Sequence, residues 1–469
     1  MRLPALRFLP ALALLVACRG TAVTAGAGAG VSNDGAHSAS AKGQQGPLPT
    51  NTVVVTPAPT VGVLGKPSCR SVKNAAFPGA SYGSVGNLRV AANPAGALIT
   101  WHQLDVPTHG DSSQVGQALF VKRGPDGDSD TRVLIPAKAY AAAAYTTLAP
   151  STFDGALDLI GFGVNGATDF MTFRGGAKAW KPSPHNDPFE AVPPTPANAV
   201  SLPFSFTESL VAAPTMPLAV LGGAEAPCAS YYACKEYEAA SNKGFPKSVR
   251  SLFFKDKAHV TEVLHRDTVN RPTKPFAPAV AASANADRAL TLFRVDKTLQ
   301  AVWFGADGKK TSSFLAWEGA DLGAPAVTFV GTSAYAAWVA RTGPKDPYRL
   351  YVARISDKAA EVVRELDVGE ESAMAPALAP LGDKLAIAWM SGDESKNGRV
   401  HLGVLAASAL VASSGPSRLK LAEELWLSDP GNHRDPELAS AEGRLYLVWA
   451  DFTIKKAEGV PTLREFTCP

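Results

Sequence analysis

The sequence predicts an all-β protein assembled from serial copies of one strand motif. Three observations carry this prediction: a pattern ending in Trp recurs, β-type apolar runs alternate with Gly- and Pro-containing turns, and helical periodicity is weak. Of the 469 residues, 46% are hydrophobic and only 19% are charged, so the chain has enough apolar surface to bury. The formal net charge is only +3, whereas nucleic-acid-binding proteins are usually strongly basic. We therefore expect no nucleic-acid partner.

The N-terminus has the features of an export signal. Two arginines precede an apolar run over residues 8–17, which is too short to span a bilayer but suits a secretory signal. The run ends in the letters LVAC, at Cys18. This ending resembles the lipobox of bacterial lipoproteins. The resemblance implies that residues 1–17 are a signal peptide cleaved before Cys18, and that Cys18 carries a diacylglyceryl thioether and an acylated amino group.

The lipobox resemblance also implies a location. Each buried methylene contributes about 0.8 kcal/mol, so two or three acyl chains on Cys18 would hold the protein to a lipid bilayer almost irreversibly. Arg19 stands where an Asp would mean retention in the inner membrane under the enterobacterial sorting rule. We therefore expect a lipid-anchored protein of the cell envelope, in the outer rather than the inner membrane. The alternative is an ordinary secretory signal in which Cys18 is incidental.

The next segment, residues 18–66, has the composition of a tether. It is rich in Gly, Ala, Ser, Thr and Pro, and no helical or strand period persists beyond three valines at 53–55. Such a composition predicts a disordered, flexible spacer with a root-mean-square span of very roughly 40 Å. The spacer would hold a folded body, residues 67–469, clear of the lipid surface.

The folded body repeats a motif that runs from Pro, preceded by Ala or Asp, to Trp. Three copies align without gaps, at Pro325–Trp338, Pro376–Trp389 and Pro436–Trp449. A looser copy covers Pro278–Phe293. Similar apolar runs occur earlier in the chain, at 98–101, 157–160 and 218–221. The Trp-containing runs are apolar at consecutive positions, which predicts strands buried on both faces.

This repeat, with anchors about 45 to 72 residues apart and several short strands in each unit, resembles the β-propeller. One four-stranded blade cannot bury both of its faces, whereas blades in a ring cover one another. Seven blades fit residues 67–469 best, and six or eight are compatible with the spacing. Two β-sandwich domains are the competing arrangement, but they do not explain serial copies of one motif.

Four cysteines remain beside Cys18, namely Cys69, Cys228, Cys234 and Cys468. An even number in an exported chain predicts disulfides rather than free thiols. Cys228 and Cys234 are close enough in sequence to close a local loop, which leaves Cys69 to pair with Cys468. Since the last blade of a propeller is often completed by an N-terminal strand, this second pairing would lock the ring. A link from Cys69 to Cys228 would contradict the closure argument.

Two glycine patterns match catalytic motifs in spacing but not in context. The G-x-G-x-x-G at 161–166 leads through Asn-Gly into a strand-like run, which predicts a hairpin turn rather than a dinucleotide site. The G-x-S-x-G around Ser81 lacks the helix that follows a nucleophile elbow. The sequence contains no HExxH, no P-loop and no sialidase-type Asp box.

Two polar clusters are candidate sites, each with a simpler alternative. Alternating Asp side chains in a turn can ligate Ca²⁺, but the Gly and Glu of an EF-hand loop are missing, so a solvated hairpin tip is the main expectation and no cofactor is required. That cluster consists of Asp126, Asp128 and Asp130. A second cluster follows the first Trp and could form a metal site, an acid–base pair or an ordinary polar loop. It consists of His102, Asp105, His109 and Asp111.

The segment from Cys228 to Tyr237 departs from the repeat and is rich in tyrosine. Tyrosine provides contact area at low entropic cost, which suits recognition, and the alternative is an irregular loop that needs a disulfide. The candidate contact residues are Tyr231, Tyr232 and Tyr237. Without a catalytic signature, the leading hypothesis is a non-catalytic propeller that binds an envelope protein or a glycan. The alternative is a glycosidase or lyase with carboxylates in the central funnel.

Overall fold

The computed structural model describes residues 68–469 apart from several gaps. The gaps are 78–81, 105–113, 125–130, 134–144, 153–154, 166, 174–180, 183–189, 193–197, 203, 226–246, 256–257, 267–279, 320, 370, 393–396, 412–416 and 455–457. The described residues form strands almost throughout, with a short 3₁₀ helix at Ala407–Leu410. No helix within these residues is long and apolar enough to cross a membrane.

Seven sheets make up this part of the chain, and we number them as blades 1 to 7. Blade 1 contains β2 (Tyr82–Asn93), β3 (Gly96–Leu104), β4 (Gln114–Lys122) and β5 (Thr131–Val133). Blade 2 contains β6 (Tyr145–Ser151), β7 (Asp158–Asn165), β8 (Ala167–Phe173) and β11 (Asn198–Leu202). Blade 3 contains β12 (Phe204–Ala212), β13 (Leu218–Glu225), β14 (Lys247–Lys255) and β15 (Ala258–Arg266). Blade 4 contains β16 (Val280–Ala284), β17 (Arg288–Val295), β18 (Thr298–Gly305) and β19 (Lys310–Glu318).

The remaining blades follow the same plan. Blade 5 contains β20 (Asp321–Val330), β21 (Ser333–Arg341), β22 (Arg349–Ile355) and β23 (Ala360–Leu366). Blade 6 contains β24 (Ala373–Leu381), β25 (Lys384–Ser391), β26 (Arg399–Ala406) and β28 (Glu423–Leu427). Blade 7 contains β29 (His433–Ala441), β30 (Arg444–Asp451), β31 (Val460–Thr467) and, from the other end of the folded body, β1 (Arg70–Ala76).

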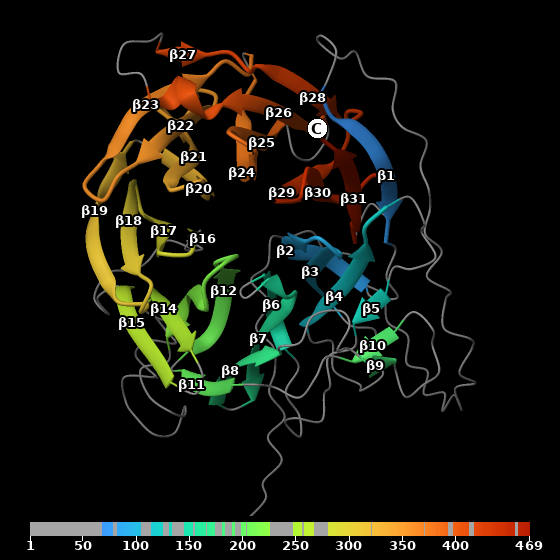
Figure 1. Ribbon diagram of the computed structural model, residues 1–469, viewed down its shortest axis with the longest axis vertical. Helices are drawn as coiled ribbons and strands as arrows, with labels where there is room; N and C mark the ends of the chain where they lie inside the picture. Colours follow the sequence, from blue (N-terminus) through green and yellow to red (C-terminus); the bar gives the residue numbers. More distant parts are fainter. Residues whose placement is uncertain are drawn as a thin grey trace, which may run out of the picture. The chain divides into compact units, whose positions relative to one another are not determined.

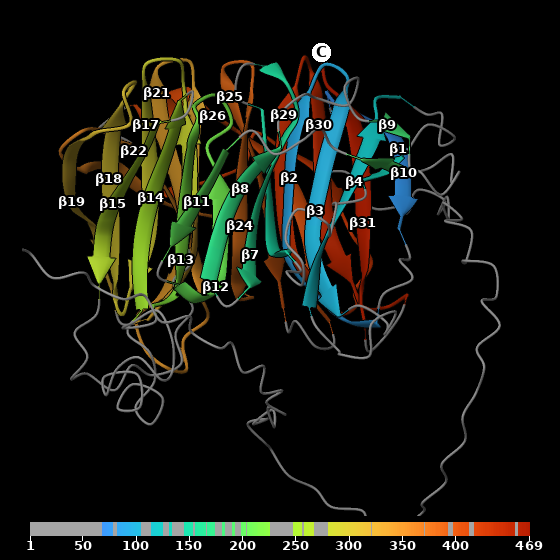
Figure 2. The ribbon, with the colours of Figure 1, turned by 90° about the horizontal axis from the view of Figure 1, so that it is seen from below.

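The blades close into a ring around a central axis. The first strand of each blade contacts the first strand of the next, from β2 through β6, β12, β16, β20 and β24 to β29, and β29 contacts β2 again (Figure 1). From the side, the strands of blade 1 lie next to those of blade 7 (Figure 2). The predicted all-β propeller is therefore confirmed, and the seven sheets agree with the preferred blade number.

The repeated Trp explains why the blades stack. Trp338, Trp389 and Trp449 lie on the second strands β21, β25 and β30 and are almost fully buried. Each second strand is buried on both faces, as the apolar runs predicted, because one face packs on the preceding blade and the other on the next. The hydrophobic core is thus divided into layers between neighbouring blades.

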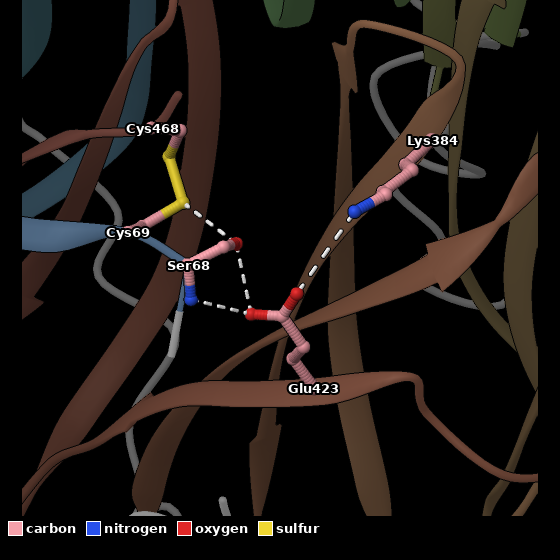
Figure 3. The surroundings of a disulfide bond; sticks show 5 residues. All are labelled: Ser68, Cys69, Lys384, Glu423 and Cys468. Carbon is pink, nitrogen blue, oxygen red and sulfur yellow. Dashed lines mark hydrogen bonds and ion pairs between the residues drawn. A yellow bond between two sulfur atoms is a disulfide. The ribbon is translucent and has the colours of Figure 1, made fainter. Parts of the chain in front are cut away.

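The ring is closed by β1 and a disulfide. Strand β1 pairs antiparallel with β31, and Cys69 is bonded to Cys468 with a Cα–Cα distance of 4.1 Å (Figure 3). The N–H and Oγ–H of Ser68 donate to Oε2 of Glu423 on blade 6, at 2.8 and 2.9 Å. The predicted pairing of Cys69 with Cys468 is confirmed. Cys18, Cys228 and Cys234 lie outside the described residues.

Two blades gain extra strands from their neighbours, a feature that the sequence did not indicate. Strand β10 (Glu190–Val192), which pairs with β9 (Lys181–Pro182), lies parallel to β5, although it comes from the chain between strands of blade 2. Strand β27 (Arg418–Leu419), from the chain between strands of blade 6, lies parallel to β23. Each addition covers backbone groups at the outer edge of a blade, where an open edge would invite pairing with another chain.

Candidate functional site

A cavity of about 1120 Å³ occupies the middle of the ring. It is lined by the first strands of all seven blades and by the hairpin turns that follow some of them. The described residues of blades 2 to 6 contribute mainly Ala, Val, Pro, Ser and Thr, and no charged residue, to this lining. The charged side chains in the lining belong to blades 1 and 7, so the wall of the cavity is chemically one-sided.

The carboxylates of this wall stand where the repeat motif begins. In blades 5 and 6 the motif opens with Ala-Pro-Ala at 324–326 and 375–377, whereas blade 7 has Asp-Pro-Glu at 435–437. The pairing register shifts at this point in all three blades, which marks a β-bulge. Asp435 has a left-handed backbone, with φ of 50°, so the bulge turns the strand locally and lets both Asp435 and Glu437 line the cavity.

Blade 1 supplies the complementary side chains. Its first strand has a register shift between Gly86 and Arg89, and Asn87 within it adopts φ of 47°, close to the value at Asp435. Arg89 donates from one terminal nitrogen to Oε1 of Glu437 and, at 3.0 Å, to the carbonyl of Leu88. The guanidinium therefore reaches across the boundary between the first and last blades, and Asn87 lines the same wall.

The surroundings of the two carboxyl groups favour their protonated forms. Burial raises the pKa of Glu437, and the neighbouring Asp435 carboxylate raises it further, while Arg89 acts in the opposite direction. Burial likewise raises the pKa of Asp435, and the positive charges of Arg89 and Arg434 act in the opposite direction. Asp435 is nonetheless open to the cavity, whereas Arg89 and Glu437 expose only 19% and 28% of their side chains. Among the described residues, Glu437 is the one of the two that pairs directly with a cation, and this contact with Arg89 opposes the effect of burial at Glu437.

This arrangement has the parts that acid–base chemistry requires. A carboxyl group whose pKa is raised can deliver a proton near neutral pH, and a second, paired carboxylate can stabilise positive charge. The cavity gives a polar ligand room to reach both groups. Among the described residues, no group of three or more His, Cys, Asp or Glu could hold a metal ion.

Of the side chains that the sequence singled out, His102 lies beside this wall. Its Nδ1 is 3.0 Å from Nδ2 of Asn87, and burial together with the Arg89 charge lowers the pKa of the imidazole. The other candidates fall outside the described residues. They are Asp105, His109, Asp111, Asp126, Asp128, Asp130, Tyr231, Tyr232 and Tyr237.

Sequence reasoning missed Arg89, Asp435 and Glu437. The signal for the two carboxylates was present in the repeat, because blade 7 replaces the two alanines that flank the motif's Pro in blades 5 and 6. Arg89 had no comparable signal, since blade 1 lacks the Pro and cannot be aligned with the motif at that position without the register of its strands.

A second polar series on blade 6 has the connectivity of a catalytic triad but not its setting. Ser391 Oγ lies 2.7 Å from Nε2 of His401, whose Nδ1 lies 3.2 Å from Oε1 of Glu424. The imidazole stacks on Trp389 with ring centroids 4.7 Å apart. Ser391 is only 4% exposed and does not line the cavity, so no substrate can reach its hydroxyl in this conformation.

The comparisons with known proteins add nothing on function. No family model matches the chain, and no curated protein does. Among solved structures, the chain is similar to one of two prolyl endopeptidases studied for inter-domain dynamics, with 12% identity over 82% of this chain and a TM-score of 0.46. The match spans about half of that protein, 47% of its length.

Two further solved structures show a similar degree of likeness. The endosialidase of phage phi92 is 8% identical over 86% of this chain and 69% of its own, with a TM-score of 0.44. A Trypanosoma rangeli sialidase bound to the inhibitor DANA is 11% identical over 70% of this chain and 58% of its own, with a TM-score of 0.39. These likenesses concern the fold alone, and the site must be interpreted from its own residues.

Proposed function

We propose that the protein is a carbohydrate-active enzyme that cleaves a glycan in the central channel. Asp435 is the proton donor, Glu437 is the ionised partner and Arg89 maintains that ionisation. The observation that carries this proposal is the pair of carboxyl groups on one wall of the cavity, of which Glu437 is paired with the Arg89 guanidinium. Glycoside cleavage uses two carboxyl groups in different protonation states, and one cation beside one of them creates that difference.

The proposed reaction follows from these roles. Asp435 gives its proton to the glycosidic oxygen as the bond from that oxygen to the sugar carbon breaks, and the leaving sugar departs as an alcohol. The Glu437 carboxylate stabilises the positive charge that develops on the sugar ring. Water then adds to the sugar carbon and gives one proton to the Asp435 carboxylate, which restores the starting state.

A non-catalytic role is the second candidate, and one observation favours it. The described residues with which blades 2 to 6 line the cavity carry side chains that do not titrate, so this part of the wall offers shape and hydrogen bonds rather than acid–base groups. In this case the same charged wall would bind a glycan or a segment of an envelope protein without turnover.

The proposal includes attachment to the cell envelope through acylated Cys18. We place this anchor in the outer rather than the inner membrane, because Arg19 stands where an Asp would mean retention in the inner membrane. Its support is the lipobox pattern at residues 15–18 and the export signal before it. Metabolic labelling with a fatty acid tests it: the wild-type protein should carry label in the membrane fraction, and Cys18→Ala should not. Unlabelled wild-type protein would contradict the anchor.

A panel of soluble polysaccharides and oligosaccharides tests the catalytic role, with reducing ends and unsaturated products as readouts. We expect turnover by the wild type and a loss of about 10²–10⁴-fold in kcat for both Asp435→Asn and Glu437→Gln. Glu365→Gln is the matched control, because Glu365 lies on the outer strand of blade 5, and it should retain full activity. Binding without turnover by the wild type would favour the second candidate, and turnover by Glu437→Gln would refute the assigned roles.

A further inference from the structure

We propose that His102 is a positioning residue of this site: as a neutral imidazole, it holds the carboxamide of Asn87 so that the Asn87 carbonyl oxygen is offered to a ligand hydroxyl in the channel. The inference deepens the proposed function and depends on it for the class of ligand, a neutral hydroxyl-bearing sugar unit. The orientation of Asn87 itself depends only on the two side chains.

The contact between the two side chains fixes their hydrogen-bonding roles. Nδ2 of Asn87 lies 3.0 Å from Nδ1 of His102. A carboxamide nitrogen can only donate, so Nδ1 must accept and the ring proton must be on Nε2. Oδ1 of Asn87 accepts no hydrogen bond from any described residue. Asn87 also lines the cavity. That oxygen is therefore the acceptor which Asn87 brings to the channel.

Two glycines on the neighbouring strands leave space for the imidazole of His102. His102 is paired across β2 with Gly86 and across β4 with Gly116, so both neighbouring positions lack a side chain. A Cβ on Gly86 would lie 2.3 Å from Nε2 of His102, which no real contact permits. Any larger residue at position 86 would displace the ring, so the pair Gly86-Asn87 both makes room for His102 and hydrogen-bonds to it.

Electrostatics keep the ring in the required state. Arg89, on the same strand as Asn87, is the charged group that acts on His102 among the described residues, and it joins burial in lowering the pKa of the imidazole. A protonated ring would carry a proton on Nδ1 and could not accept from Asn87. The carboxamide would then turn its oxygen to the imidazolium and its NH₂ to the channel, so acidification would replace an acceptor in the site by a donor.

Nitrogen NMR on the full folded body, with histidine labelled by ¹⁵N, tests the orientation without any ligand. At pH 7 we expect one ring with a bare Nδ1 and a protonated Nε2 that is missing from the spectrum of His102→Gln. Its titration midpoint should lie below the ordinary value of about 6.5. In Asn87→Ala the neutral ring loses its donor, so the midpoint should rise. A proton on Nδ1 at pH 7 in the wild type would overturn the proposal.

Ligand affinity tests the consequence for the site, with KM or Kd measured for a glycan that the panel identifies. His102→Gln places a non-titrating oxygen near Asn87, so affinity should stay within about threefold and its decline at low pH should disappear. His102→Leu removes the acceptor and should weaken affinity about tenfold, the effect of one hydrogen bond, with little change in kcat. Equal affinity and pH dependence in His102→Leu and the wild type would refute the positioning role. The NMR result stands whether or not the glycan is cleaved, so failure of the proposed function is distinguishable.

Discussion

Arg89 on β2 and Glu437 on β29 form an ion pair between the first and the last blade of the ring. The two residues are 348 positions apart in the chain, and they meet only because the ring closes. The pairing of β1 with β31 and the Cys69–Cys468 disulfide close the same ring. The candidate site is thus a product of the closed ring, since neither end of the folded body contains it alone.

The ion pair should contribute to stability as well as to the site. Arg89→Met leaves a mostly buried Glu437 carboxylate without its partner, and we expect the free energy of unfolding to fall by about 1–3 kcal/mol at pH 7. Urea unfolding followed by Trp fluorescence measures this loss. The double variant with Glu437→Met removes both charges and should lose less than the sum of the two single variants. Additive losses would show that the two side chains do not interact.

Asp435 should make the protein less stable as the pH rises. Its pKa is raised in the folded state, so the folded protein holds this proton more tightly than the unfolded chain. The stabilisation that the protonated Asp435 carboxyl group contributes is therefore present at low pH and is lost as the pH rises through its pKa in the folded state. Asp435→Asn keeps the left-handed backbone, which Asn tolerates, and removes the ionisation.

Thermal unfolding of Asp435→Asn and the wild type at several pH values checks this sign. We expect the variant to unfold at a higher temperature at pH 7 and the difference to shrink as the pH falls, because the folded protein then takes up the Asp435 proton. Asp287→Asn is a control at an exposed hairpin, and it should behave like the wild type throughout. A variant that is less stable than the wild type at pH 7 would show that the ionised carboxylate stabilises the fold.

The sequence was sufficient for the fold because the repeat has a direct physical cause. Each buried Trp, such as Trp389, fills the space between two blades, so the motif recurs wherever a blade must be covered. The pairing of Cys69 with Cys468 followed from the same ring. The extra strands β10 and β27 were not predictable, because each is two or three residues long and its partner belongs to another blade.

The site was less predictable for a reason of geometry. His102 was a candidate because it is one of several titratable residues just after the first Trp, but its partner Asn87 is a common turn residue without a recognisable pattern. Asp435 and Glu437 are separated from Arg89 by most of the chain, and only the contact of β2 with β29 in the closed ring brings them together. A comparison of the repeats for positions that break their own consensus would have found the two carboxylates.

The hydrogen-bonded series from Ser391 through His401 to Glu424 should be structural. Ser391→Ala should lower the free energy of unfolding by about 1 kcal/mol, the usual contribution of one hydrogen bond, and should leave glycan binding unchanged. His401→Leu should cost more, because it also leaves the buried Ser391 hydroxyl without its partner. An organophosphorus fluoride provides the chemical test: labelling of the wild type that Ser391→Ala abolishes would reveal an accessible nucleophile.

The disulfide should stabilise the closed ring more than any single noncovalent contact. Its two cysteines are 399 positions apart, and the chain-entropy model gives about 6 kcal/mol for a loop of this length. The paired variant Cys69→Ser and Cys468→Ser should therefore unfold at a clearly lower urea concentration. Strand β1 then depends on its hydrogen bonds to β31 and on the contact of Ser68 with Glu423.

Hydrogen exchange locates the effect within the variant. Amides of β1 should exchange much faster than in the wild type, while those of the central strand β21 should change less, because β1 is the outer strand of its blade and β21 is buried on both faces. Since β2 follows β1 directly in the chain, a loosened β1 should also weaken the contact of Arg89 with Glu437 and lower glycan affinity. The pair Cys228→Ser and Cys234→Ser is the control for loss of cysteine, and it should leave β1 protected. Unchanged exchange in β1 after removal of Cys69 and Cys468 would show that the strand pairing alone holds the ring closed.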